Sequence, residues 1–483
     1  MKKLAALILL LVSQAYAAPE DYLVTVNLPM CDGSANVKHI SQNADWADIN
    51  DPQYDIFCVY PGDYDLFGVI SITQSGTDQS PKWIRWYDPA DSTDTTTHPY
   101  HNQAKAANVR SIEISGDHWI VDRISGDNEP WSTTGNFILF NRLWLHDMST
   151  GMISMRGNDI QVQHSFFGPH PKIPGQDRET VYVGGGGDTD GSTGSRNKII
   201  ANEGYNLGDF FQAGPDAGKG LVISGNDVYN DSDYNADCSD GSPDPEGLCS
   251  CSEQPVTFKG PLFTDTWHVV EDNTMRDIRN NINLCGGTGA NYASISLSSH
   301  AAPTRNILFQ RNIITGAHPA GGAQHGVQTE NIIYKNNIFD LRGSDNNANV
   351  SALATASDTV ATYFEGNTVI GSTANWMRTY GGANQINSAF RCNAFIDSGE
   401  AFLQAAADST FKIVDNFYYN TPATSASGPP DRTQTYGSSA SANNTDLVID
   451  ITPISNPGAT MTVTGVKPTT SSPHYGCINW MGS

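Results

Sequence analysis

The sequence has little positive charge. Its 483 residues include 27 lysines and arginines against 51 aspartates and glutamates, which gives a formal net charge of −24. Binding to nucleic acid needs a basic face, so we expect no nucleic-acid partner. An anionic ligand is also disfavoured by such a chain, unless cations or a local basic patch offset the field.

Beyond its N-terminus the chain also lacks a long apolar run. It begins with MKK, continues with LAALILLLV and then reads SQAYA. A basic start, an apolar stretch too short to span a bilayer and a small-x-small site are typical of a secretory signal peptide. We predict a signal peptide over 1–17, cleaved after Ala17. We therefore expect a secreted protein, extracellular or periplasmic, with no membrane span.

Cysteines are few but even in number. All eight lie in the predicted mature chain: Cys31, Cys58, Cys238, Cys249, Cys251, Cys285, Cys392 and Cys477. Disulfide bonds are expected outside the cytoplasm, although spacing alone does not fix their pairing. Cys238, Cys249 and Cys251 share one loop and could form a clasp there.

Long helical periodicity is absent too, and short apolar or alternating runs separated by Gly and Asn take its place. Such runs predict β-strands joined by turns. One phrase, apolar residues around a central asparagine, recurs with shortest spacings of about two dozen residues. Its asparagines are Asn226, Asn273, Asn312, Asn337, Asn367, Asn393 and Asn416, and His164 and Asn202 head weaker copies.

This period, without helices between the strands, is typical of an all-β parallel β-helix. An asparagine at the same corner of each coil tolerates left-handed torsions and can bond its amide to the asparagines above and below. The long intervals from His164 to Asn202 and from Asn226 to Asn273 predict loops on the middle coils. We assign the β-helix to 18–420 and a Ser/Thr/Pro-rich cap to 421–483, where Cys477 could reach Cys392.

Alternation within the strands predicts which side chains leave the coil. Counting back equally from the repeated asparagines aligns Gln212, Lys259 and Ser298 on one outward face, in GDFFQ, VTFK and SISLS. VYV would add Tyr182 to this face, and ISMR would add Arg156. His300 follows just after Ser298, and His325 lies on the next coil.

The first coils resemble a known family. "YPGDYD…ISI…SGTDQSPKWI" and "IEISGDHWIVDRISG" are similar to the opening of secreted, right-handed, pectin-lyase-like β-helix polysaccharide lyases of the chondroitinase B and alginate lyase group. The architectural resemblance covers roughly residues 55–416. It implies β-elimination on an anionic, uronic-acid polysaccharide, with a strand-end lysine as base, an arginine nearby and calcium on the substrate carboxylate. Lys259 in EQPVTFKG matches that lysine.

The other family residues match less well. Cys285, in NLCGG, stands where the family arginine is expected, so an arginine from another loop would substitute: Arg156, Arg178 or Arg279. We take Arg279 as catalytic with Lys259, Tyr182 as proton donor and His300 as a further candidate. We take Arg156, Arg178, Gln212 and His325 as substrate-binding. For calcium, Glu253 is the nearest carboxylate, and the aspartates within 184–194 and 231–246 are alternatives.

Two other functions stay open. A glycoside hydrolase on the same scaffold would need outward carboxylates across a groove, for which Asp209, Asp227, Asp265 and Glu271 are available. A non-catalytic protein could use the same face merely to bind sugar. In each case we expect a monomer, because nothing in the sequence calls for an obligate oligomer.

Overall fold

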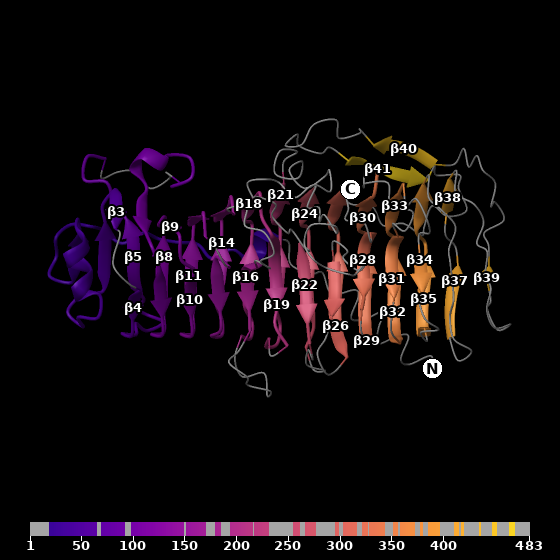
Figure 1. The fold of residues 1–483 in the computed structure, drawn as a ribbon, viewed down its shortest axis with the longest axis horizontal. Coiled ribbons are helices and arrows are strands. Elements are labelled where there is room, and N and C mark those ends of the chain that lie inside the picture. Colours follow the sequence, from indigo (N-terminus) through magenta and orange to yellow (C-terminus); the bar gives the residue numbers. More distant parts are fainter. Residues whose placement is uncertain are drawn as a thin grey trace, which may run out of the picture.

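The computed structural model is built almost wholly of short parallel strands (Figure 1). It describes residues 19–64, 69–91, 98–148, 151–170, 179–184, 194–215, 217–230, 255–260, 266–276, 295–298, 303–315, 321–326, 328–342, 351–355, 358–371, 377–379, 385–396, 410–414, 417–419, 434–435, 447–451 and 463–468. The predicted signal peptide lies outside these residues and stays a prediction. No helix in the described part of the chain is long and apolar enough to cross a membrane.

The strands form three long parallel sheets, which we name A, B and C. Sheet A contains β1 (Val37–Ile40), β2 (Ile56–Val59), β5 (Lys82–Trp86), β8 (Trp119–Asp122), β11 (Ile138–Asn141), β14 (Gln161–Gln163), β17 (Lys198–Ile200), β20 (Val222–Ser224), β23 (His268–Glu271), β26 (Thr304–Gln310), β29 (Thr329–Lys335), β32 (Thr359–Glu365), β35 (Gln385–Arg391), β37 (Thr410–Val414) and β39 (Gln434–Thr435).

Sheet B contains β3 (Gly62–Tyr64), β6 (Ala107–Val109), β9 (Ser125–Asp127), β12 (Trp144–His146), β15 (Phe166–Phe167), β18 (Glu203–Tyr205), β21 (Asp227–Tyr229), β24 (Thr274–Arg276), β27 (Ile313–Thr315), β30 (Ile338–Asp340), β33 (Thr368–Ile370), β36 (Ala394–Ile396) and β38 (Phe417–Tyr419). Sheet C contains β4 (Ile70–Ile72), β7 (Ile112–Ile114), β10 (Trp131–Thr133), β13 (Ile153–Met155), β16 (Glu179–Val183), β19 (Asp209–Ala213), β22 (Val256–Lys259), β25 (Ile295–Ser298), β28 (Gly321–His325), β31 (Ser351–Thr355) and β34 (Met377–Thr379).

Each coil of the chain visits the sheets in turn, so the fold is the predicted right-handed parallel β-helix. The remaining elements in the described part of the chain are three short 3-10 helices and one hairpin. The helices are η1 (Pro19–Tyr22), η2 (Asn43–Asp48) and η3 (Gln103–Lys105), and the hairpin pairs β40 (Leu447–Ile451) with β41 (Val463–Pro468). Because β39 pairs with β37, sheet A continues into the segment that we assigned to the cap.

A row of aromatic rings fills the coil interior. Phe211, Phe258, Phe309, Tyr334 and Phe364 follow one another, with neighbouring ring centroids 4.9–6.1 Å apart. All five side chains are buried. Burial of apolar rings, stacked coil on coil, is the main favourable contribution to such a fold.

The repeated asparagines form a continuous ladder at the corner between sheets A and B. Each side-chain Nδ2 donates to the Oδ1 of the next asparagine over 2.8–3.1 Å, from Asn202 through Asn226, Asn273, Asn312, Asn337 and Asn367 to Asn393. This confirms the predicted stacking. Asn416 lies outside the described residues.

Two details of that prediction were wrong. The left-handed torsion belongs to the residue before the asparagine, such as Asp272 (φ 55°) or Arg311 (φ 54°). His164 is also left-handed (φ 51°), so the ladder position on its coil is Ser165, whose backbone N–H donates to Asn202 Oδ1. A left-handed residue ends the strand of sheet A and turns the chain, and the asparagine then secures the new direction.

The segment from Pro19 to Cys31 runs over part of the outer face of sheet A, where it contacts β5, β14 and β17. Gln161 donates to the carbonyl of Tyr22, and Gln163 exchanges two hydrogen bonds of 2.9 Å with the backbone of Val24. A disulfide bond joins Cys31 to Cys58. Cys392 is also in a disulfide, whereas Cys477 and the predicted cysteine clasp lie outside the described residues.

Candidate active site

Sheet B is covered on its outer side at β12 and β15. The ring of Tyr100 stacks on Phe166 at 3.5 Å, and Trp144 stacks on His146 at 3.8 Å. Trp144, His146 and Phe166 are consequently buried. Further toward the N-terminus, a cavity of about 480 Å³ opens on this face, lined by Asp63, Tyr64, Asn108, Arg110, Asp127 and Asn128.

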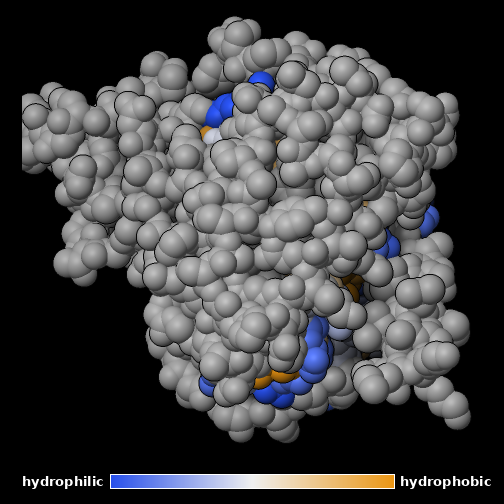
Figure 2. Space-filling view, turned by 90° about the vertical axis from the view of Figure 1, so that its right-hand side faces the viewer, coloured by the Kyte–Doolittle hydropathy of each residue, from blue (hydrophilic) through white to orange (hydrophobic). Residues whose placement is uncertain are grey.

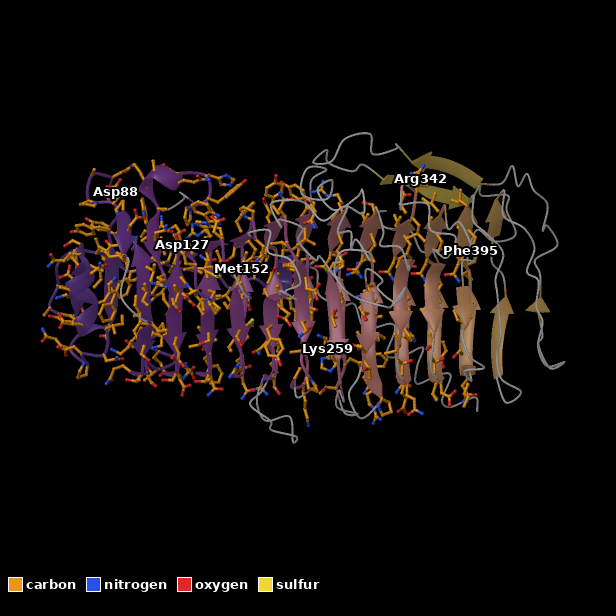
Figure 3. All side chains as sticks on the ribbon, in the orientation of Figure 1. Asp88, Asp127, Met152, Lys259, Arg342 and Phe395 are labelled. Carbon is orange, nitrogen blue, oxygen red and sulfur yellow. A yellow bond between two sulfur atoms is a disulfide. The ribbon has the colours of Figure 1, made fainter. Side chains whose placement is uncertain are left out.

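Sheet C carries the residues that the sequence singled out. In Figure 3, Lys259 is labelled at β22, in the middle part of the solenoid. Val256 and Phe258 of this strand point into the core, as predicted, and the half-buried Lys259 ends the strand. Lys259 opposes Ser298 of β25, which confirms their predicted alignment.

The register corrects the alignment of Gln212. This residue opposes Thr257, and on its other side it opposes Tyr182, which in turn opposes Ser154. Two outward rows therefore run across sheet C, two residues apart along the strands. The sequence merged them because counting back from the asparagines ignores differences in loop length between coils.

Lys259 belongs to the second row. Met155, Val183, Ala213 and Phe258 are successive partners, so continuing the register by one residue aligns Arg156, Gly184, Gly214 and Lys259. We call these four residues the cationic row. With strands about 4.8 Å apart, Arg156 and Lys259 stand about 14 Å apart at backbone level. Two residues without side chains lie between the two cations.

Tyr182 leans across this gap. A Cβ placed on Gly184 would lie 2.6 Å from the Tyr182 hydroxyl oxygen and 2.7 Å from its Cε1. Only a glycine leaves room for the ring there, because real Cβ contacts are longer than this. The phenol therefore lies over Gly184 in the cationic row. The neighbouring Arg156 of this row is exposed and donates from Nε to Ser154 Oγ at 3.4 Å.

Gln212 lies beside this row and is only 5% exposed. Its side-chain Nε2 donates to Glu179 Oε1 at 2.7 Å. Its own Oε1 is buried and has no hydrogen-bond partner in the described part of the chain. A buried acceptor without a donor is uncommon in proteins and needs an explanation.

The prediction of His325 as a substrate-binding residue was wrong in its placement. His325 is fully buried inside the coil, with Nε2 3.0 Å from the Tyr334 hydroxyl and Nδ1 3.0 Å from Thr329 Oγ1. It opposes Leu297, an inward position of the neighbouring strand. Burial lowers the pKa of His325 to about 3, so the ring is neutral.

Four predicted site residues lie outside the described part of the chain: Arg178, Glu253, Arg279 and His300. For calcium, the described residues contain no group of three His, Cys, Asp or Glu side chains that could hold a metal ion. The predicted calcium ligands, Glu253 and the aspartates within 184–194 and 231–246, lie outside these residues, so the calcium site stays a prediction and we base no chemical step on that ion. The orphan Gln212 oxygen, which sequence reasoning could not have found, is the feature that the structure adds.

Comparisons with known proteins give distant fold relatives only. No family model and no curated protein matches the sequence. Among solved structures, the chain is similar to an alginate lyase from Paenibacillus sp. strain FPU-7, with 13% identity, a TM-score of 0.37 and coverage of 82% of this chain and 98% of that one.

It is also similar to the A-module of the Azotobacter vinelandii mannuronan C-5 epimerase AlgE4, with 10% identity, a TM-score of 0.41 and coverage of 84% and 98%. A third similar structure is the catalytic domain of a GH87 alpha-1,3-glucanase, with 10% identity, a TM-score of 0.38 and coverage of 84% and 71%. At these identities the likeness concerns the fold, and the strand pairing itself establishes that fold.

Proposed function

We propose that the chain is a secreted polysaccharide lyase that cleaves a uronic-acid polymer by β-elimination. The observation that carries the proposal is the cationic row on sheet C, where Arg156 and Lys259 face the same side across a floor of two glycines. In a chain with a net charge of −24, such a row is a local basic patch along which an anionic polymer could lie.

In β-elimination a base removes the proton from the carbon next to the uronate carboxylate, and the glycosidic oxygen leaves from the neighbouring carbon. We assign Lys259 as that base, because it is the last residue of β22 and stands at one end of the cationic row, with Arg156 at the other. The developing charge must be neutralised by a cation close to the reacting carboxylate. We assign this role to Arg279, with Arg178 and His300 as further candidates; all three lie outside the described residues.

Arg156 and Tyr182 fit the binding of neighbouring sugars better than the chemical step. Arg156 stands three strand spacings from Lys259, about 14 Å, and therefore faces the carboxylate of a different sugar. Tyr182, two spacings away, offers its ring or hydroxyl to the sugar between them. In its predicted role as proton donor, the Tyr182 hydroxyl would have to reach the glycosidic oxygen beside Lys259, about 10 Å away.

The glycoside hydrolase alternative lacks a common site among the described carboxylates that the sequence singled out for it. Asp209 lies in sheet C, Asp227 in sheet B and Glu271 in sheet A, so these three do not face one groove. Two carboxylates separated by roughly 5–10 Å are needed for hydrolysis. Asp265 lies outside the described residues.

The proposal is tested by incubating the protein with alginate, pectate and chondroitin sulfate and following absorbance near about 235 nm, where the unsaturated uronate product absorbs. We expect a rise with at least one polymer, and a loss of roughly 10²–10⁴-fold in the Lys259→Ala variant, the usual contribution of a general base. Ser132→Ala, an outward change on an earlier strand of sheet C, serves as the control and should retain full activity.

Three outcomes would contradict the proposal. New reducing ends without absorbance would indicate a hydrolase, and binding without either signal would indicate a sugar-binding protein. A Lys259→Ala variant that retains full elimination activity would remove the assignment of the base.

A further inference from the structure

The amide of Gln212 has a fixed orientation. Its Nε2 donates to Glu179 Oε1 at 2.7 Å, and turning the amide over would bring two acceptor oxygens together. The Oε1 atom therefore faces away from Glu179, and none of the described residues donates a hydrogen bond to it. Among the described residues that bury such an orphan polar atom, Gln212 alone lies on the outward face of sheet C.

Its neighbours place this oxygen at the sugar-binding face. Gln212 opposes Tyr182 on one side and Thr257 on the other. Gly214, two residues further along the same strand, forms part of the floor of the cationic row. A sugar ring that crosses Gly214 on its way from Arg156 to Lys259 would therefore pass beside the Gln212 oxygen.

The chemistry of the ligand follows from the atom. An amide oxygen only accepts, so it needs either a hydroxyl or N–H donor or a cation. The described side chains form no metal-binding group, and each ring of a uronic-acid polymer carries hydroxyls. Resting on the proposed function, we propose that Gln212 is a specificity-determining residue that accepts a hydrogen bond from a free ring hydroxyl of the polymer, so that O-acylated or O-sulfated sugar is rejected at this position.

An ester removes the hydroxyl hydrogen and brings an acceptor oxygen to the same place. The Gln212 oxygen then keeps no donor and faces a second acceptor in an enclosed site, a mismatch that protein sites discriminate against strongly. We expect at least about tenfold weaker binding of the O-acetylated sugar, the equivalent of one hydrogen bond.

Binding is measured by calorimetry in the Lys259→Ala background, which should bind without cleavage. The probes are a tetrasaccharide of the polymer that shows elimination, or oligomannuronate if none does, and its O-acetylated form. Lys259→Ala should prefer the free form about tenfold or more. Gln212→Met keeps the length of the side chain but removes the acceptor. Adding it should bring the ratio of the dissociation constants of the acetylated and free sugars close to one.

Controls separate this role from others. Gln103→Met, at an exposed glutamine in η3, should leave the preference unchanged. Glu179→Gln is a second variant in case Gln212→Met does not fold, because it gives the Gln212 amide a partner that permits either orientation, and it should weaken the preference. A preference that survives both substitutions, or that is missing from Lys259→Ala itself, would overturn the proposal.

Two further results keep the proposals distinguishable. If a chelator abolishes the preference, the oxygen binds a cation instead of a hydroxyl, and the inference is wrong. If the wild-type protein shows no elimination on any polymer yet discriminates the acetylated sugar through Gln212, the lyase proposal fails while the role of Gln212 stands.

Discussion

The asparagine corner and the outward face of sheet C are both rows of polar side chains, one residue from each coil, yet they differ in two respects. At the corner, the same residue recurs from Asn202 to Asn393, and every amide both donates and accepts. On sheet C, Ser154, Tyr182, Gln212 and Thr257 follow one another, and the Gln212 oxygen has no partner among the residues that the structure describes.

This difference separates two roles of polar rows in a solenoid, stabilising the stack of coils and binding a ligand. A residue that repeats on successive coils is placed to bond to its own copies, so it stabilises the stack. A residue that changes from coil to coil cannot do this, and an unmet acceptor among such residues indicates a position kept for a ligand.

Figure 2, a view toward the C-terminal end of the coil, shows described residues in mixed hydrophilic and hydrophobic patches.

The largest expected effect concerns the corner. Asn273 accepts from the backbone N–H and the side chain of Asn226, and donates to the Ile223 carbonyl and to Asn312 Oδ1. Asn273→Ala leaves several buried groups unsatisfied, so we expect a loss of about 3–5 kcal/mol in the free energy of unfolding. Urea unfolding, followed by circular dichroism, measures it.

The matched comparison is Ser132→Ala on sheet C, a surface change expected to alter stability by less than about 0.5 kcal/mol. If Asn273→Ala and Ser132→Ala lowered the free energy of unfolding by the same amount, the asparagine corner would have no special structural role. The contrast between repeated and varied rows would then lose its physical basis.

The repeated corner is also what made the fold predictable. Asparagines at a regular spacing indicated stacked coils, and alternation correctly placed Val256, Phe258 and Leu297 inside. The site was less accessible to such reasoning. The outward rows are defined by register. The connection from sheet C to sheet A is longer after β22 than after β19, so counting back from the asparagines aligned Gln212 with Lys259 and not with Thr257.

His325 shows a second limit of the sequence. A histidine in a polar phrase reads as an outward residue, but Thr329 and Tyr334 supply hydrogen-bonding partners for it inside the coil. Those partners lie on a different sheet, four and nine residues later. A buried polar network of this kind can be recognised only after the register of the strands is known.

The next effect in size is the pH dependence that this buried histidine confers. Burial lowers the pKa of His325 to about 3, against about 6.5 in an unfolded chain. Its contribution to stability is therefore complete above pH 6.5 and is lost as the pH falls from there toward 3. At pH 5 the loss is about 2 kcal/mol relative to neutral pH, since each pH unit corresponds to about 1.4 kcal/mol.

Urea unfolding of the wild type and of His325→Gln at about pH 7, 6 and 5 tests this effect. The substitution should destabilise the protein at pH 7 and flatten the pH dependence below 6.5. His268, which is also buried with a pKa lowered to about 3, keeps part of the dependence in the variant. An unchanged slope in His325→Gln would show that the ring does not stay neutral in the folded protein.

The smallest expected effect on stability is that of a substitution in the cationic row. It tests whether a row that varies from coil to coil serves binding and not stability. Arg156 is exposed, and its Nε donates only to Ser154 Oγ, at 3.4 Å, among the described residues. Arg156→Gln should therefore leave stability within about 0.5 kcal/mol, because no buried group loses a partner. We expect Arg156 to bind the carboxylate of a sugar that is distant from the scissile bond. Such an interaction is equally strong in the ground state and in the transition state.

Such uniform binding predicts that KM for the polymer rises about tenfold while kcat stays unchanged, with the difference shrinking at high salt. Arg110→Gln, at an exposed pair with Glu129 on the sheet B face, is the matched loss of one positive charge. If Arg110→Gln raised KM equally, general charge and not position along the cationic row would govern binding. If Arg156→Gln lowered kcat instead, the polymer would have to place its reacting sugar nearer to Arg156 than the three strand spacings from Lys259 allow.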